Sequence, residues 1–218
     1  MTDAPDPSPL ERLREGNRRF LSGDARSAAA RPVEQRRELQ HGQSPWAVVL
    51  TCSDSRVPPE LIFDQGLGDV FVVRVAGNVV TPTQLGSVEY AVEVLGTRLV
   101  VVLGHTRCGA VTAALDEALS PSHGLSSNLR ALTDPIRPAV KAALAERAGS
   151  DGGGGATSTL SETEREEVVA DAIRRNVASS VAALRTESEI LDRLARVDGL
   201  VVVGAEYALE DGSVSFLD

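Results

Sequence analysis

The chain has 218 residues, a formal net charge of −9, an apolar content of 42% and an aromatic content of only 3%. The length suits one domain with a sizeable core, and the composition is that of a globular protein rather than a disordered one. The acidic balance argues against nucleic-acid and anionic-membrane partners, which favour a basic face, and no apolar run reaches the roughly 18 residues of a membrane helix.

Hydrophobic periodicity and turn residues divide the chain into alternating helices and strands. The predicted elements are, in chain order, a helix over Pro9–Leu21, a helix over Pro32–His41, a strand over Trp46–Leu50, a short helix over Pro59–Phe63, a strand over Val70–Val75, a helix over Thr83–Leu95, a strand over Leu99–Leu103, a helix over Cys108–Leu119, a helix interrupted by prolines over Ala131–Ala148, one or two helices over Glu162–Arg196, a strand over Gly199–Gly204 and a short edge strand over Val214–Phe216. Ser161, with Glu164 three residues later, predicts a capping box at the start of the long helical segment.

Strands that are continuous Val and Leu runs, alternating with helices, predict an α/β fold. We expect a single domain over residues 1–218, with a mostly parallel central sheet of four strands, an antiparallel edge strand, flanking helices and an N-terminal helical arm. That arm is expected to lie over its own domain or across another subunit. Residues 1–8 are expected to be loose, and the Gly-rich stretch 149–160 is expected to be a flexible surface loop. In such sheets ligands bind beyond the carboxyl ends of the strands.

The five residues Cys52-Ser53-Asp54-Ser55-Arg56 follow the first predicted strand. They place a soft anion former, a carboxylate and a guanidinium together where a buried strand opens into a loop. Cys52 and Asp54 are two residues apart, so both side chains can project to one side of an extended chain. Arg56 can then fork onto the Asp54 carboxylate. The same residues also suit an ordinary capped turn with a solvated Arg56.

A second polar turn, with the pattern H-x-x-C, follows the third predicted strand. Its spacing lets His105 and Cys108 face one point, and Cys52 lies at another predicted strand end. Two thiolates and one imidazole make a good zinc site, because zinc takes S and N ligands tetrahedrally. Three alternatives stay open: cysteines that are small buried hydrophobes, a cysteine–histidine nucleophilic pair, and a purely structural zinc. His41 and His123 have no such neighbours and are interpreted as surface residues.

The two cysteines and the start of the chain bear on the compartment. Residues 1–6 contain no basic region followed by an apolar stretch, so no secretory signal is expected. We therefore expect a cytoplasmic protein. In a reducing compartment two thiols are metal ligands, nucleophiles or core residues rather than a structural disulfide.

At these residues the sequence resembles the β-class carbonic anhydrases. The residues that carry the resemblance are Cys52, Asp54 and Arg56 of the signature C-x-D-x-R, His105, Cys108 and Gly109 of the signature H-x-x-C-G, and the intervening Ala76-Gly77-Asn78. The resemblance implies one Zn²⁺ per chain, bound by the two cysteines and the histidine, and the reversible hydration of carbon dioxide to bicarbonate and a proton. It also implies a homo-oligomer, a dimer or a dimer of dimers, with active sites at the subunit interface.

The resemblance gives Asp54 and Arg56 the catalytic roles. It implies that zinc-bound hydroxide attacks carbon dioxide while Asp54, held by Arg56, orients it. It further implies a closed form at lower pH, in which Asp54 itself becomes the fourth zinc ligand. Two thiolates cancel the charge of the zinc ion, so we expect this site to acidify water less than a site of three neutral histidines and to favour activity at higher pH.

The resemblance also implies a substrate pocket. Gln43, nine residues before Cys52, matches the amide that hydrogen-bonds substrate in the plant-type enzymes. Phe71 and Tyr90 match an apolar wall that the neighbouring subunit contributes there. Gly109 of the second signature is assigned to the same substrate-binding group.

One subgroup of the family has a pocket in which bicarbonate inhibits, and this chain departs from its pattern. The tryptophan three residues before the first cysteine is Val49 here, although Arg74 and Tyr207 match the other members. Two further functions stay open on the same scaffold: hydrolysis of a related small molecule such as carbon disulfide, and a non-catalytic bicarbonate-binding protein with a structural zinc.

Overall fold

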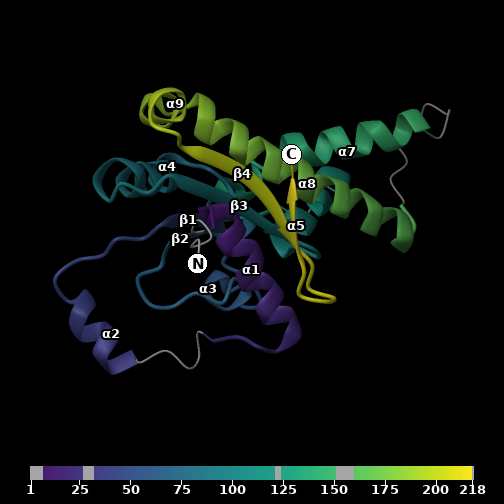
Figure 1. The fold of residues 1–218 in the computed structure, drawn as a ribbon. Coiled ribbons are helices and arrows are strands. Elements are labelled where there is room, and N and C mark those ends of the chain that lie inside the picture. The colour runs from purple at the N-terminus through teal and green to yellow at the C-terminus, as the bar shows by residue number, and fades with distance from the viewer. Residues whose placement is uncertain (1–6, 27–31, 121–123, 151–159, 218) are drawn as a thin grey trace.

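A central sheet of five strands organises the domain, and its strand order is β2-β1-β3-β4-β5 (Figure 1). The computed structural model describes residues 7–26, 32–120, 124–150 and 160–217. The strands are β1 (Ala47–Thr51), β2 (Val70–Arg74), β3 (Leu99–His105), β4 (Val201–Tyr207) and β5 (Val214–Leu217). The first four run parallel and β5 is antiparallel to β4, which confirms the predicted α/β fold with an antiparallel edge strand.

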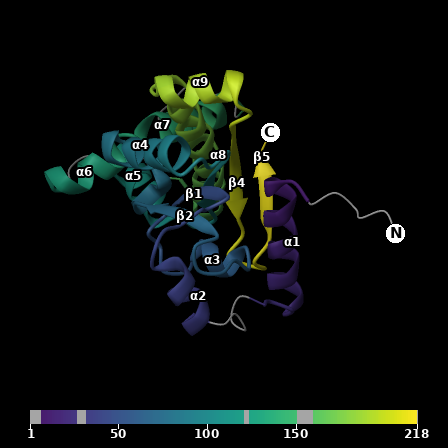
Figure 2. The ribbon, with the colours of Figure 1, turned by 60° about the vertical axis from the view of Figure 1, so that its left-hand side comes forward.

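Helices cover both faces of this sheet (Figure 2). One face packs against α4 (Pro82–Glu89), its π-helical continuation η3 (Tyr90–Val94), α8 (Glu162–Thr186) and α9 (Glu189–Val197). The other face packs against α1 (Pro9–Ser22) and α3 (Pro59–Ile62). A further cluster joins α8 to α5 (Gly109–Leu119) and α7 (Arg137–Ser150) and includes both cysteines. The remaining helices are α2 (Pro32–Leu39), η2 (Ala76–Asn78) and α6 (Ser127–Thr133).

Two strands are longer at their carboxyl ends than the sequence predicted. β3 continues past Leu103 to His105, and β4 begins at Val201 and reaches Tyr207. The prediction treated glycine as a strand terminator, whereas here Gly104 and Gly204 are sites where α8 approaches the sheet closely. A Cβ atom would lie 2.5 Å from Val177 Cγ2 at Gly104, and 2.7 Å from Val177 Cγ1 at Gly204.

Local capping explains where the predicted helices divide. The helical segment predicted over Ala131–Ala148, with proline interruptions, forms two helices with Pro135 between them: α6 begins earlier than predicted, after its cap Ser126, and α7 starts at Arg137. The segment over Glu162–Arg196 forms two helices, because Ser188 caps α9 by accepting a hydrogen bond from Leu191 N–H. The capping box of Ser161 and Glu164 is confirmed.

The N-terminal helix packs on its own domain. Leu13 is fully buried, and Asn17 donates to the carbonyl oxygens of Ile62 and Gly212 at 3.2 and 3.0 Å. Ser8 caps α1, while residues 1–6 of the predicted loose segment lie outside the described residues. The predicted Gly-rich loop also lies largely outside them, since α7 extends to Ser150 and the description resumes at residue 160.

Among the helices of the described ranges, none combines the length and the apolar character required to cross a membrane.

The contact between α8 and the sheet makes Gly204 intolerant of a side chain. We expect Gly204→Ala to lower the free energy of unfolding by about 1–3 kcal/mol, because the added methyl group overpacks against Val177. Gly86→Ala is the matched control: no atom lies within 4 Å of its added Cβ, and alanine favours a helix interior. Urea denaturation of both variants measures the effect. A Gly204→Ala variant as stable as the wild type contradicts this close packing.

Candidate active site

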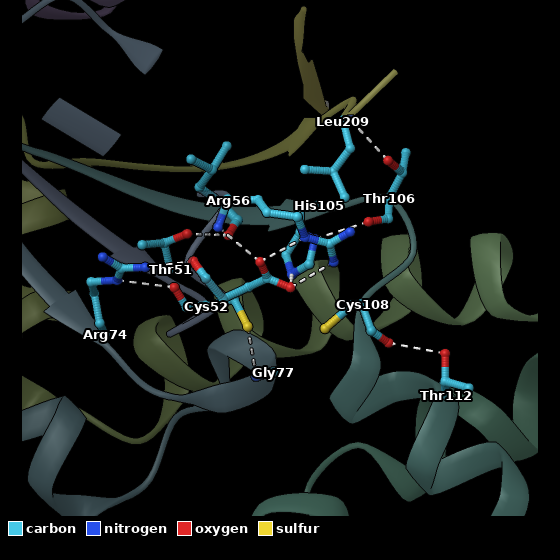
Figure 3. Close-up of polar contacts among 12 residues, drawn as sticks. Thr51, Cys52, Arg56, Arg74, Gly77, His105, Thr106, Cys108, Thr112 and Leu209 are labelled. Atoms are coloured by element: carbon cyan, nitrogen blue, oxygen red, sulfur yellow. Dashed lines mark hydrogen bonds and ion pairs between the residues drawn. The ribbon is translucent and has the colours of Figure 1, made fainter. Parts of the chain in front are cut away.

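Neighbouring parallel strands bring the two cysteines and His105 to one edge of the sheet. Cys52 directly follows β1, His105 ends β3, and Cys108 is the residue before α5. β1 and β3 are adjacent, so their carboxyl ends meet. The two sulfur atoms and one imidazole nitrogen all lie within 4.8 Å of one another. Figure 3 shows the three side chains directed toward one another from these different segments.

The imidazole of His105 is arranged with one nitrogen free for a ligand. Its Nδ1 lies 2.9 Å from the carbonyl oxygen of Thr106. A carbonyl oxygen only accepts hydrogen bonds, so Nδ1 carries the proton and Nε2 presents a lone pair. The side chain is fully buried, and Nε2 has no hydrogen-bond partner in the described part of the chain. A buried lone pair of this kind, fixed by a bond from the other ring nitrogen, is the usual state of a metal-bound histidine.

The two cysteines behave as a pair that retains one proton. A hydrogen bond from the Cys108 thiol, aided by one from Gly77 N–H at 3.3 Å, lowers the pKa of Cys52 well below that of an ordinary thiol. The hydrogen bond to Cys52, together with burial, raises the pKa of Cys108. One thiolate is therefore ready to bind a cation, and a bound cation would replace the proton that Cys108 retains. The chemistry of this donor set fits zinc.

Asp54 and Arg56 form a fork beside the two sulfurs. Arg56 Nε donates to Asp54 Oδ1 at 2.9 Å, Arg56 Nη2 donates to Oδ2 at 2.7 Å, and the Arg56 backbone N–H also donates to Oδ1. These bonds hold the pKa of Asp54 well below its usual range. Asp54 Oδ2 lies 4.0 Å from His105 Nε2, so the carboxylate borders the three candidate ligands. The Asp54 side chain therefore caps the turn through the Arg56 backbone N–H and also forms an ion pair with the Arg56 guanidinium.

Arg74 holds this loop in place from β2. Its Nε donates to the carbonyl oxygen of Cys52 at 3.1 Å, and its Nη2 donates to that of Asp54 at 2.7 Å. The sequence suggested Arg74 only as part of a bicarbonate pocket. The other two residues of that pattern, Val49 and Tyr207, are buried in the cluster beneath α1 and α3.

The hairpin between β4 and β5 supports the turn that carries His105 and Cys108. Glu210 accepts a hydrogen bond from Thr106 Oγ1 at 2.8 Å and pairs with Arg107 Nε at 3.0 Å. Leu209 N–H donates to the same threonine oxygen. Arg107 has a φ of +55°, which is unusual for a residue other than glycine. Sequence reasoning missed Glu210, because no local pattern links it to a turn about a hundred residues earlier.

The four predicted substrate-binding residues occupy different parts of the chain. Gln43 is exposed in the segment before β1, and Gly109 is the exposed first residue of α5, next to Cys108. Phe71 and Tyr90 lie together, with ring centroids 6.3 Å apart. Phe71 pairs with Val48 in the sheet, so it lies toward the amino end of β2, away from the three candidate ligands of its own chain.

Comparison with known proteins places this fold in a class of enzymes. A family model described as carbonic anhydrase matches residues 47–214. Carbonic anhydrase 2 of Mycobacterium tuberculosis is 40% identical over 206 residues, which cover 94% of this chain and 90% of that protein. The carbonic anhydrase of Mycolicibacterium smegmatis is 39% identical over 202 residues, which cover 93% of this chain and 88% of that protein.

Solved structures give the same answer for the fold. The β-carbonic anhydrase CafA of Aspergillus fumigatus has a TM-score of 0.71 at 28% identity, covering 96% of this chain and 90% of that one. A tetrameric β-carbonic anhydrase of Sordaria macrospora has a TM-score of 0.69 at 25% identity, covering 95% and 96%. The sheet and its flanking helices therefore have the β-carbonic anhydrase fold. The chain belongs to the β-carbonic anhydrases, zinc enzymes whose general reaction is the hydration of carbon dioxide.

The geometry predicts that the metal depends on all three candidate ligands. We expect about one zinc ion per purified chain, and strong loss of zinc in His105→Ala and Cys108→Ser, because a site with an open position has only three protein ligands. His41→Ala is the matched control, since His41 is exposed and does not belong to the group of candidate ligands in the described residues. Elemental analysis of each variant measures the metal. Full zinc content in His105→Ala contradicts the assignment.

Proposed function

We propose that Cys52, His105 and Cys108 bind one Zn²⁺ and that the chain catalyses the reversible hydration of carbon dioxide to bicarbonate and a proton. The observation that carries this proposal is the convergence of two sulfurs and the unpartnered Nε2 of His105 within 4.8 Å of one another. Beside them lies the Asp54 carboxylate, which accepts hydrogen bonds from Arg56. A structural zinc site has no need of that carboxylate–guanidinium pair.

The bound zinc ion would supply Lewis acidity, which lowers the pKa of water toward neutrality. Asp54 would accept a hydrogen bond from the attacking water and so aim a lone pair of its oxygen at carbon dioxide. The water oxygen would add to the carbon of carbon dioxide and form bicarbonate. The proton that the water loses would pass to solvent or buffer. Asp54 suits this role because its lowered pKa keeps it a pure acceptor at every working pH.

Arg56 would determine whether Asp54 accepts a hydrogen bond from water or binds the zinc ion. Two side-chain bonds and one backbone bond fix both carboxylate oxygens and their direction. A carboxylate released from this fork would be free to approach the metal ligands, since Oδ2 already lies 4.0 Å from His105 Nε2. Arg56 therefore keeps Asp54 available as an acceptor and prevents it from becoming a ligand.

We also propose that the active unit is a homodimer or a dimer of dimers. Gln43 and Gly109 would contact substrate from one subunit, and Phe71 and Tyr90 would supply the apolar wall from its neighbour. The position of Phe71, away from the ligands of its own chain, supports this arrangement. The tetrameric state of the Sordaria macrospora relative supports an oligomer. The whole chain, residues 1–218, would form one such domain and act in the cytoplasm.

Loss of Arg56 tests the role of the fork. We expect Arg56→Ala to lower the rate of carbon dioxide hydration about tenfold or more at neutral pH, because misorientation of a catalytic group has effects of this order. Arg18→Ala, at a similarly exposed arginine on α1, should match the wild type. Stopped-flow hydration assays measure both variants. An Arg56→Ala variant that is more active than the wild type at neutral pH contradicts the proposal.

The pH profile of the wild type tests the same chemistry. We expect activity to rise between about pH 6.5 and pH 9, because a two-thiolate zinc acidifies water only moderately. Protonation of Asp54 does not cause this rise, because its lowered pKa keeps the carboxylate ionised throughout the range. Stopped-flow assays with carbon dioxide, and with carbon disulfide as the competing substrate, decide the reaction. A flat profile, or hydration no faster than the buffer blank, contradicts the proposal.

Subunit complementation tests the shared site. We expect a mixture of Cys52→Ser and Tyr90→Ala chains to be more active than the sum of the two separate variants, because one site of each mixed dimer is then complete. A mixture of Cys52→Ser and His105→Ala chains is the matched control and should not recover, since both ligands come from one chain. The absence of recovery in the first mixture contradicts a wall contributed by the neighbouring subunit.

A further inference from the structure

The turn Ala76-Gly77-Asn78 lies against Cys52 and contacts its sulfur directly. Gly77 N–H donates a hydrogen bond to Cys52 Sγ at 3.3 Å (Figure 3). Gly77 has a φ of +78°, and an added Cβ would lie 2.6 Å from Ile136 Cδ1. Glycine is therefore required here both for the backbone conformation and for space. The proposed function assigns no role to this turn.

A polar face of α8 holds the turn in this conformation. Asn176 Nδ2 donates to the Gly77 carbonyl oxygen at 2.8 Å, and Ser180 Oγ donates to the Asn78 carbonyl oxygen at 3.0 Å. The two side chains are four residues apart, so they share one helix face. Both are buried, at 1% and 4% exposure. Buried polar side chains that bind backbone carbonyls at a helix–turn contact fix a specific backbone position.

Asn176 and Cys52 therefore bind the same glycine, one at its carbonyl oxygen and the other at its N–H. Asn176 binds the Gly77 carbonyl, while the Gly77 N–H points at the sulfur. A hydrogen bond to a thiolate stabilises its charge and makes the sulfur a weaker electron donor to a bound metal. Groups outside the ligand set orient the ligands and tune the metal in this way.

We propose that Asn176 is a positioning residue that maintains the Gly77 N–H bond to Cys52 and thereby tunes Cys52 as a metal ligand. This inference rests on the proposed zinc site. It adds a residue of α8, more than a hundred positions after Cys52 in the sequence, to the groups that control the metal centre.

Cobalt substitution tests the proposal, because thiolate-to-cobalt charge-transfer absorption reports directly on the sulfur. We expect Asn176→Ala to move this band to longer wavelength, because a sulfur without the Gly77 bond donates more strongly to the metal. We also expect it to lower zinc affinity about tenfold in a chelator competition, because the turn no longer holds Cys52 in position. Ser180→Ala is the matched control: it removes a buried hydrogen bond from the same helix face to the next carbonyl. It should lower the melting temperature comparably and leave the band and the zinc affinity unchanged.

A wild-type band and a wild-type zinc affinity in Asn176→Ala overturn the positioning role, as does an equal change in Ser180→Ala. If Asn176→Ala does not fold, Asn176→Ser, which keeps a shorter donor, should show a smaller shift in the same direction, and no shift overturns the proposal. Wild-type protein that takes up cobalt or zinc but does not hydrate carbon dioxide contradicts the proposed function, while the band of the variants still decides the role of Asn176.

Discussion

The convergence of three soft donors at one edge of a parallel sheet is the constraint on which this molecule depends. β1 and β3 are adjacent and parallel, so whatever follows each strand meets at the same edge. Cys52 follows one strand and His105 ends the other, and α5 begins directly after Cys108. The lone pair of the imidazole is then fixed by a single bond from its other nitrogen to a backbone carbonyl. A cation is the natural partner for such a group, because two sulfurs and an unpartnered nitrogen are costly to bury alone.

At this edge of the sheet, charged side chains form hydrogen bonds both with backbone groups and with one another. Arg74 binds the carbonyl oxygens of the Cys52 loop, and Glu210 binds the turn after β3. Arg56 binds the Asp54 carboxylate with its side chain and its own N–H. Each ligand-bearing segment is therefore fixed by a partner from a different strand or hairpin. This arrangement leaves the carboxylate as the component whose position a single side chain controls.

Much of the architecture follows from patterns that are local in sequence. Continuous Val and Leu runs predicted the parallel strands, because such strands are buried on both faces. The short spacing within each signature predicted which side chains share a turn. The spacing also predicted the Arg56 fork onto Asp54, which two hydrogen bonds confirm.

The contacts that the sequence did not reveal join segments that lie far apart. Gly104 and Gly204 were interpreted as strand ends, but they are the points at which Val177 of α8 meets the sheet. Neither Glu210 nor Asn176 belongs to a local motif, and each acts on a turn about a hundred residues away. Periodicity within a segment contains no information about which distant segment packs against it, so these residues needed the fold.

X-ray absorption at the zinc edge of the purified protein tests the central claim most directly. The account predicts a first shell with two sulfur atoms at about 2.3 Å, one imidazole nitrogen at about 2.0 Å and one further light atom. A first shell without sulfur, or a protein without zinc that still hydrates carbon dioxide, contradicts it.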